Sequence, residues 1–157
     1  MLSGNDFNGR LVKAKVLFLC TGNSARSQMA EGYLRHVLSD QYEALSAGIE
    51  PKGLNPLAVE TMREIGIDIS QQESKDVASL LGQPMPYVVT VCDNAKERCP
   101  IFPGAGKFLH WSLIDPAAAE GTQEERLALF RKVRDEIIGH IERDFVLGGA
   151  SKQRATG

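Results

Sequence analysis

Short apolar runs alternate with helix-like patterns along this chain, and the alternation limits the folds open to it. Four runs have the length and composition of β-strands: residues 15–20, 42–47, 87–92 and 107–111. The first and third are continuously apolar, which is typical of strands covered on both faces. Strands separated by helices favour a parallel sheet with right-handed crossovers. The sequence therefore predicts a three-layer α/β fold, with a four-stranded parallel sheet and helices on both faces.

The segments between and after these strands carry helix signals. Residues 25–39 and 124–145 each place apolar side chains on one helical stripe, which we expect to pack as core. Asn55 followed by Pro56 is a capping pair that predicts a helix to about residue 65. Ser74 is expected to cap a short helix that ends before Gly82.

The length of 157 residues suits one domain with a sizeable core. We expect that domain over residues 14–147. The segments 1–13 and 148–157 are rich in glycine and polar residues, and we expect both to be flexible.

Composition argues against several classes of partner. The net charge of -2 gives no basic surface for nucleic acid or an anionic membrane. The apolar runs fall far short of the ~20 residues that a membrane span needs. The first residues lack the basic and apolar segments of a secretory signal, so we expect a cytoplasmic protein. No self-complementary surface pattern is evident, and we expect a monomer.

The residues that follow the first strand have the composition of an oxyanion-binding loop. They are Cys20, Thr21, Gly22, Asn23, Ser24, Ala25, Arg26 and Ser27. N–H groups of such a turn and of the helix N-terminus converge on an anion, and the guanidinium of Arg26 can hold two of its oxygens. Cys20 lies in the same positive field, which suits a thiolate nucleophile. The alternative is a buried cysteine at a strand end, followed by an ordinary turn.

Two further cysteines, Cys92 and Cys99, extend this hypothesis. Three cysteines cannot all be paired within one chain, and thiols in a reducing compartment are more often buried, metal-bound or catalytic. Cys20 and Cys92 both end predicted strands. Because ligands bind at the carboxyl ends of parallel strands, the fold can bring these two thiols to one crevice. Asp115 follows the fourth strand and can overhang the same edge.

The spacing of Cys92 and Cys99 has a consequence for motion. If Asp93 caps a helix that runs through residue 98, the two cysteines lie about 10 Å apart at ~1.5 Å rise per residue. A disulfide needs Cα atoms within ~4.4–6.8 Å. The segment 93–99 would therefore have to unwind before the pair could be joined. The alternative interpretation of Cys99 is a single buried cysteine.

The motifs resemble those of a known family. Four stretches carry the likeness: CTGNSARSQMAEG at 20–32, SAGIE at 46–50, VTVCDNAKERCP at 89–100 and HWSLIDPA at 110–117. They are similar to the low-molecular-weight protein tyrosine phosphatase fold. Cys92 and Cys99, in the third of these stretches, make the chain resemble the thioredoxin-coupled arsenate reductases within that fold.

The resemblance implies a first chemical step. Cys20 would attack arsenate held by the loop 20–27, with phosphate or sulfate as competing oxyanions. Ser27 would donate a hydrogen bond to Cys20, and Asp115 would be the general acid. No tightly bound cofactor is implied.

The resemblance also implies a thiol relay. Cys92 would attack Cys20 and release arsenite, and Cys99 would then attack Cys92. Two thiols that become one disulfide supply the two electrons that As(V) needs to become As(III). Thioredoxin would reduce the final disulfide, with a glutaredoxin or a small thiol as alternatives.

The chain departs from the family pattern in two places. Ala25 stands where many members have another cysteine, which is not one of the redox thiols. Some members bind potassium through residues that match Asn23, Glu31, Ser46 and an acidic side chain near position 75. Here that position is Lys75, whose ammonium group could replace the cation and pair with Glu31, so we predict no metal. A solvated surface lysine is the alternative.

Two other functions remain open from the sequence. A phosphotyrosine phosphatase would need Cys20, Arg26 and Asp115 only. Phosphatases of this fold usually carry an aromatic residue after the Asp-Pro pair, whereas this chain has alanines at 117–119. A thiol sensor or zinc module would use the cysteines as ligands, but the Cys92–Cys99 spacing is wider than zinc sites usually have.

The three histidines receive structural interpretations. His36 and His140 fall on charged helix faces, and we expect both to be exposed. His110 ends the fourth predicted strand, and we expect it to pack under the loop.

Overall fold

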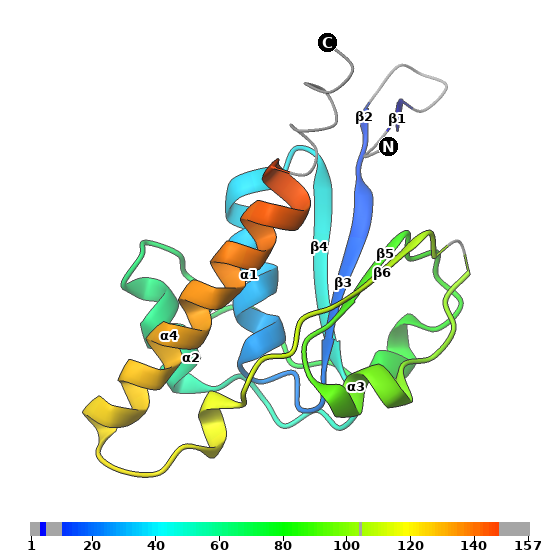
Figure 1. The fold of residues 1–157 in the computed structure, drawn as a ribbon. Helices are drawn as coiled ribbons and strands as arrows, with labels where there is room; N and C mark the ends of the chain where they lie inside the picture. Colours follow the sequence, from blue (N-terminus) through cyan, green and yellow to red (C-terminus); the bar gives the residue numbers. More distant parts are fainter. Residues whose placement is uncertain (1–3, 6–10, 104, 148–157) are drawn as a thin grey trace.

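A four-stranded parallel sheet forms the centre of the protein (Figure 1). The computed structural model describes residues 4–5, 11–103 and 105–147. The sheet consists of β3 (Ala14–Cys20), β4 (Tyr42–Gly48), β5 (Tyr87–Thr90) and β6 (Lys107–His110), in the order β4-β3-β5-β6. The apolar run 16–20 of β3 is completely buried, as a central strand requires. The predicted parallel sheet is confirmed.

Two short strands precede this sheet. β1 (Gly4–Asn5) and β2 (Leu11–Val12) pair in antiparallel fashion. They lie inside the segment 1–13 that the sequence predicts to be flexible. Residues 1–3 and 6–10 of that segment, like the predicted flexible tail 148–157, lie outside the described residues.

Helices cover both faces of the sheet. The helical elements are α1 (Arg26–Leu38), α2 (Pro56–Arg63), α3 (Asp93–Arg98), α4 (Gln123–Ile141), the 3-10 turns η1 (Val77–Leu80) and η2 (Pro116–Ala118), and the π-helical turn η3 (Glu142–Leu147). The crossovers β3-α1-β4 and β5-α3-β6 lead in opposite directions from the centre, and right-handed crossovers then place α1 and α3 on opposite faces. In Figure 1, α1, α2 and α4 lie together on one side of the sheet, and α3 lies near the ends of β5 and β6.

The strand order fixes where a ligand can bind. The chain leaves β3 toward β4 on one side, and leaves β5 toward β6 on the other. The point between β3 and β5 is therefore the topological switch point, where a crevice opens at the carboxyl ends of the strands. Cys20 ends β3, and Cys92 follows β5 by two residues.

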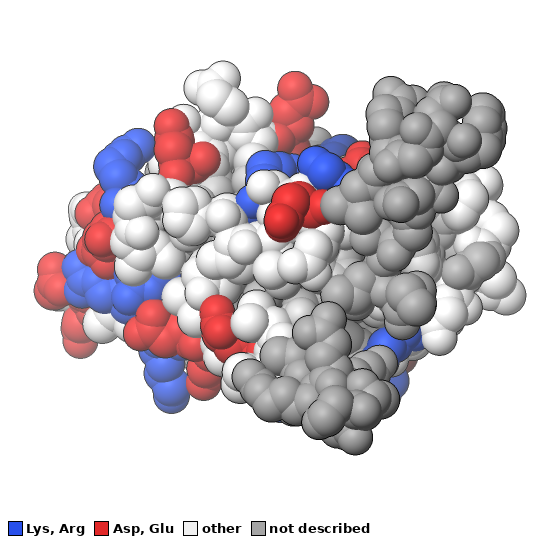
Figure 2. Space-filling model, turned by 90° about the horizontal axis from the view of Figure 1, so that it is seen from above, with Lys and Arg blue, Asp and Glu red and all other residues white. Residues whose placement is uncertain are grey.

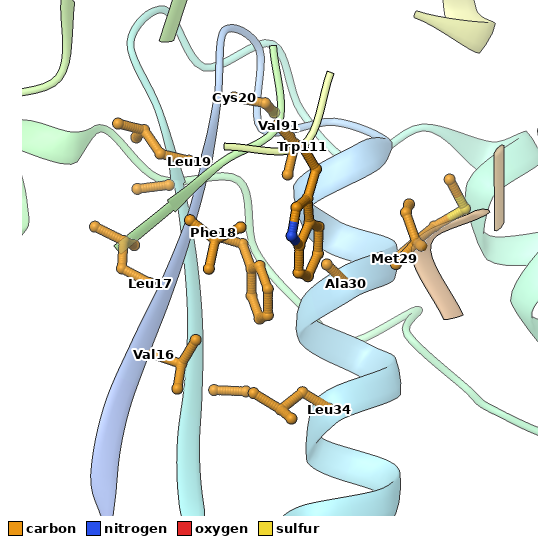
Figure 3. Close-up of a cluster of buried hydrophobic side chains, with 14 of the residues drawn as sticks. Val16, Leu17, Phe18, Leu19, Cys20, Met29, Ala30, Leu34, Val91 and Trp111 are labelled. Carbon is orange, nitrogen blue, oxygen red and sulfur yellow. The ribbon is translucent and has the colours of Figure 1, made fainter. Parts of the chain in front are cut away.

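An aromatic cluster fills the core beneath this edge. Phe18 of β3 lies 5.7 Å from Trp111 between ring centroids, and Figure 3 shows the indole between Phe18 and Ala30 of α1. The ring centroid of Phe145 lies 6.4 Å from that of Phe18 and 5.3 Å from that of Tyr42, and both pairs pack edge to face. The predicted helical stripe over 124–145 thus reaches the core, although α4 ends at Ile141 and η3 carries Phe145.

The predicted helix cap at Ser74 is wrong. Residues 75 and 76 run beside β4: the N–H of Gly48 donates to the carbonyl of Lys75 at 2.8 Å, and Gly48 bridges to Asp76. This pairing keeps the chain extended past Ser74. The cap of η1 is Asp76, whose side chain accepts the N–H of Ala78 at 2.8 Å.

The predicted exposure of His140 is also wrong, whereas His36 is exposed as predicted. The His140 ring stacks on Trp111, with centroids 4.9 Å apart and planes 11° apart. Burial lowers the pKa of His140, and the charge of Arg143 lowers it further. The indole N–H of Trp111 donates to Asp144 at 2.8 Å, so the end of α4 and η3 are fixed to the strand end.

The surface seen from the end where the strands begin has mixed charge. Figure 2 shows Lys and Arg side chains interspersed with Asp and Glu on the described part of this face. Among the described residues, no helix combines the length and apolarity needed to cross a bilayer.

Candidate active site

The loop from Cys20 to Arg26 turns its N–H groups inward. Four of its carbonyl oxygens accept hydrogen bonds of 2.8–3.2 Å from backbone N–H groups of residues 49–55. These carbonyls belong to Cys20, Thr21, Gly22 and Ser24. In a planar trans peptide the following N–H points away from the carbonyl, so the N–H groups of the next residues point into the loop. Converging N–H groups at a helix N-terminus are a typical oxyanion site.

Asn23 supports the curvature of this loop from inside. It has a φ of 46°, in the left-handed region, and its side chain is completely buried. Its Oδ1 accepts the backbone N–H of Lys75 at 2.7 Å, which fixes the orientation of the amide. Its Nδ2 therefore donates to Ser27 Oγ at 2.8 Å and to Ser46 Oγ at 2.9 Å.

The sulfur of Cys20 receives two hydrogen bonds. The N–H of Asn23 donates to Sγ at 3.1 Å, and Ser27 Oγ lies 2.8 Å from Sγ. Because the Ser27 oxygen already accepts from the Asn23 amide, its own proton is free to donate to the sulfur. The structure thus places Ser27 beside Cys20, as the sequence predicts, and both donors suit a nucleophilic sulfur.

A cavity of about 360 Å³ opens above this sulfur, lined by Cys20, the loop, Arg26 and Asp115. Arg26 is buried, and its Nη1 donates to the carbonyl of Leu113 at 3.0 Å. Its Nη2 lies 3.8 Å from Oδ2 of Asp115. The Asp115 carboxylate is about half exposed and accepts the N–H of Ala117 at 3.0 Å, so η2 holds it at the rim.

Lys52 also lines this cavity, and the sequence reasoning missed it. Its backbone N–H donates to the carbonyl of Gly22 at 2.9 Å. The sequence could have predicted this position, because Lys52 follows β4, and the carboxyl end of β4 lies at the same edge of the sheet as Cys20. Gln28 was missed as well: it is completely buried and donates to the carbonyls of Asn23 and Glu73, both at 3.0 Å.

The structure brings Cys92 to the same loop. Its Sγ lies 3.3 Å from Thr21 Oγ1, and Asn94 Nδ2 donates to that oxygen at 2.9 Å. The Thr21 proton is therefore free to donate to the Cys92 sulfur. The cap of α3 is Cys92, not Asp93 as predicted, because the sulfur accepts the N–H of Ala95 at 3.4 Å.

Cys99 lies at the other end of α3 and does not meet Cys92. Its thiol donates to the carbonyl of Pro100 at 3.4 Å, and burial raises its pKa. It lines a second, mainly apolar cavity of about 330 Å³ together with Ile101, Phe108 and His110. All three cysteines are free thiols.

The predicted replacement of a cation by Lys75 fits the geometry found. Lys75 Nζ lies 4.0 Å from Glu31 Oε1 and donates to the carbonyl of Glu73 at 3.2 Å. Glu31 also accepts from Arg35 and from Ser46 Oγ. Across the described ranges, no three His, Cys, Asp or Glu side chains gather closely enough to hold a metal ion. The absence of a metal stays a prediction.

Comparisons with known proteins find similar arsenate reductases. The chain is 52% identical over 131 residues to an arsenate reductase of Shouchella clausii, covering 83% of this chain and 94% of that one. It is similar to the structure of an arsenate reductase in the phosphate-binding state, with a TM-score of 0.67 and 30% identity over 83% of this chain and 95% of that one. A thioredoxin-dependent arsenate reductase of Corynebacterium glutamicum is similar with a TM-score of 0.57 and 29% identity, over 84% of this chain and 63% of that one.

One family profile covers nearly all of the described domain. It is that of the low molecular weight phosphotyrosine protein phosphatases, and it matches residues 15–144. The match includes the oxyanion-binding loop 20–27, Cys92, Cys99 and Asp115. The chain therefore belongs to the low molecular weight phosphotyrosine protein phosphatase family.

Proposed function

We propose that this protein is an arsenate reductase that uses Cys20, Cys92 and Cys99 as a thiol relay. One observation carries the proposal: the Cys92 sulfur lies 3.3 Å from the hydroxyl of Thr21, the residue that follows Cys20 in the oxyanion loop, so two thiols serve one loop. A phosphatase needs one thiol at such a loop. A reductase needs two, because two thiols that form one disulfide deliver the two electrons.

Binding would use the positive interior of the loop. The inward N–H groups and the guanidinium of Arg26 fit a tetrahedral oxyanion, and arsenate, phosphate and sulfate share that shape. Phosphate and sulfate should therefore compete with arsenate. The protein would need no tightly bound cofactor for this step.

In the first chemical step, the Cys20 sulfur attacks arsenic and forms an S–As(V) bond. The oxygen opposite the sulfur leaves as water after it receives the proton of Asp115. Asp115 stands 3.8 Å from Arg26 at the rim of the cavity, within reach of an oxygen that points outward. The Ser27 hydroxyl faces the attacking sulfur.

In the second step, the Cys92 sulfur attacks Cys20 Sγ. A Cys20–Cys92 disulfide forms, the S–As bond breaks, and its electron pair stays on arsenic, which leaves as arsenite. The Thr21 hydroxyl and the N–H of Ala95 both face the attacking sulfur.

In the third step, Cys99 attacks Cys92 and frees the Cys20 thiolate. The six residues of α3 separate the two cysteines by about 10 Å at ~1.5 Å rise, so the segment 93–99 must unwind first. Thioredoxin then reduces the Cys92–Cys99 disulfide. Dependence on thioredoxin in a similar reductase supports this electron donor. We also propose a cytoplasmic location, where thiols stay reduced.

The phosphatase reaction is the second candidate, since it needs only Cys20, Arg26 and Asp115. The cavity wall beyond Asp115 consists of Ala117 and Ala118, which offer no aromatic face for a substrate ring. A weak phosphatase side activity is therefore what we expect.

The decisive experiment is arsenate-dependent NADPH oxidation with thioredoxin and thioredoxin reductase. The proposal requires oxidation with the wild type and none with Cys92→Ser. Hydrolysis of para-nitrophenyl phosphate by the same two proteins is the control. A phosphatase without reductase activity would hydrolyse the ester in both variants and oxidise no NADPH, which would refute the proposal.

A further inference from the structure

One side chain contacts the chain on both sides of Cys92. His110 ends β6, and its Nδ1 lies 2.7 Å from Oγ1 of Thr90. Its Nε2 lies 2.9 Å from Oδ1 of Asp93. Thr90 precedes Cys92 by two residues and Asp93 follows it directly. The imidazole therefore spans the short segment that carries the second thiol.

Hydrogen-bond chemistry assigns the protons of this contact. A carboxylate only accepts, so Nε2 of His110 carries a proton and donates it to Asp93. In the neutral ring, Nδ1 is then an acceptor, and the hydroxyl of Thr90 donates to it. Both ring nitrogens are satisfied, and the contact specifies one tautomer.

The segment needs such a contact because its own structure is weak. A helix of six residues is marginal without external contacts, and α3 is held at its N-terminal end by Asp93–His110 and by Asn94–Thr21. Cys92 is extended, with φ -150° and ψ 157°, and its sulfur must face Thr21 to reach Cys20. A small rotation of the segment would turn the sulfur away from the loop.

We infer that His110 is a positioning residue for Cys92: it holds Thr90 and Asp93 so that the Cys92 sulfur points at the anion site. The inference rests on the proposed relay and assigns a residue to its second step. His110 is not among the residues that line the cavity above Cys20. Its loss should therefore slow attack by Cys92 and leave attack by Cys20 unchanged.

The test uses a Cys99→Ser background, in which the reaction stops after one turnover. In that background His110→Phe removes both contacts, His110→Gln keeps a donor near the Nε2 position, and His110→Asn keeps a group near the Nδ1 position. We expect arsenite release and Cys20–Cys92 disulfide formation to slow about tenfold with Phe, as expected for a lost positioning contact, and less with Gln and Asn. Hydrolysis of para-nitrophenyl phosphate should not change. His36→Asn, at an exposed histidine of α1, is the matched control.

A second variant and a second readout keep the test independent of folding and of arsenate. Asp93→Ala removes one contact from a side chain that is 77% exposed, so it spares the core. Disulfide formation between Cys20 and Cys92 can be driven by diamide, without arsenate, and should slow in the same order. The reduced wild type should show the Nε2–H tautomer of His110 by ¹⁵N NMR.

Three results would overturn the inference: wild-type disulfide rates in folded His110→Phe and in Asp93→Ala, equal slowing of ester hydrolysis, or the opposite tautomer. Failure of the wild type to reduce arsenate would instead refute the proposed function. The diamide and NMR measurements would still decide the role of His110 in that case.

Discussion

Replacing Gly48 with alanine should damage the anion loop from outside the cavity. A Cβ at this position would lie 2.8 Å from the carbonyl oxygen of Thr21 and 2.9 Å from both N and Cβ of Asn23. Ordinary contact begins at 3.4 Å, so the loop or β4 must move by about 0.6 Å. The obstructing atoms are mostly backbone and cannot rotate away. Such overpacking costs ~1–3 kcal/mol, and a shift approaching 1 Å at a reacting centre costs up to ~10²-fold in rate.

The assay compares kcat/KM for arsenate, phosphate affinity and thermal unfolding in Gly48→Ala and a control. Gly139→Ala is that control, because a Cβ at Gly139 in α4 would meet no atom of another element within 4 Å. Removing a helical glycine should raise stability by ~0.5–1 kcal/mol and leave kcat/KM unchanged. For Gly48→Ala we expect kcat/KM to fall at least ~10-fold. If Gly48→Ala kept the wild-type kcat/KM and the wild-type phosphate affinity, the argument would be refuted that position 48 must be glycine because the loop at Thr21 and Asn23 approaches it so closely.

The proposed relay makes four further outcomes testable. Cys20→Ser should abolish arsenate reduction and ester hydrolysis together, because both begin with the same sulfur; reduction without hydrolysis would contradict this. Asp115→Asn should slow the first step by ~10²–10⁴-fold in single-turnover measurements while all three thiols remain titratable. Cys99→Ser should release one equivalent of arsenite and stop as a Cys20–Cys92 disulfide, whereas Cys92→Ser should release none and keep ester hydrolysis. Because burial raises the pKa of Cys99 and only its thiolate attacks, formation of the Cys92–Cys99 disulfide should keep accelerating with pH beyond the ordinary thiol range, and stopped-flow rates that level off earlier would refute this.

The layout of the sheet could be predicted because buried strands require continuous runs of apolar residues, which are visible in the sequence. Residues 16–20 must be apolar to lie between two helix layers, and Asn55 with Pro56 specifies a helix start by local chemistry alone. The Ser74 cap failed for the opposite reason. Pairing with Gly48, which is distant in the sequence, keeps residues 75 and 76 extended, and the local sequence does not predict this pairing.

The site divides in the same way. Cys20, Arg26 and Ser27 belong to one short motif, so the sequence could predict their meeting. Lys52 follows β4 at the same edge of the sheet, so its place at the cavity could also have been predicted. His110 takes its place from the register of β5 and β6. The pairing of His110 with Thr90 follows from β5 and β6 lying side by side, which spacing along the chain does not encode.

The direction of hydrogen bonds at the three sulfurs matches the order of the proposed relay. At Cys20 and at Cys92 the sulfur faces a hydroxyl whose oxygen already accepts from an asparagine amide, so the hydroxyl proton goes to the sulfur. Both sulfurs are thus arranged as acceptors, the form in which a thiolate attacks. Cys99 is arranged as a donor to the carbonyl of Pro100, and burial raises its pKa. Unwinding of the segment 93–99 would break that bond as it brings the sulfurs together. Loss of that bond would free the Cys99 sulfur for its attack on Cys92, the third step of the proposed relay.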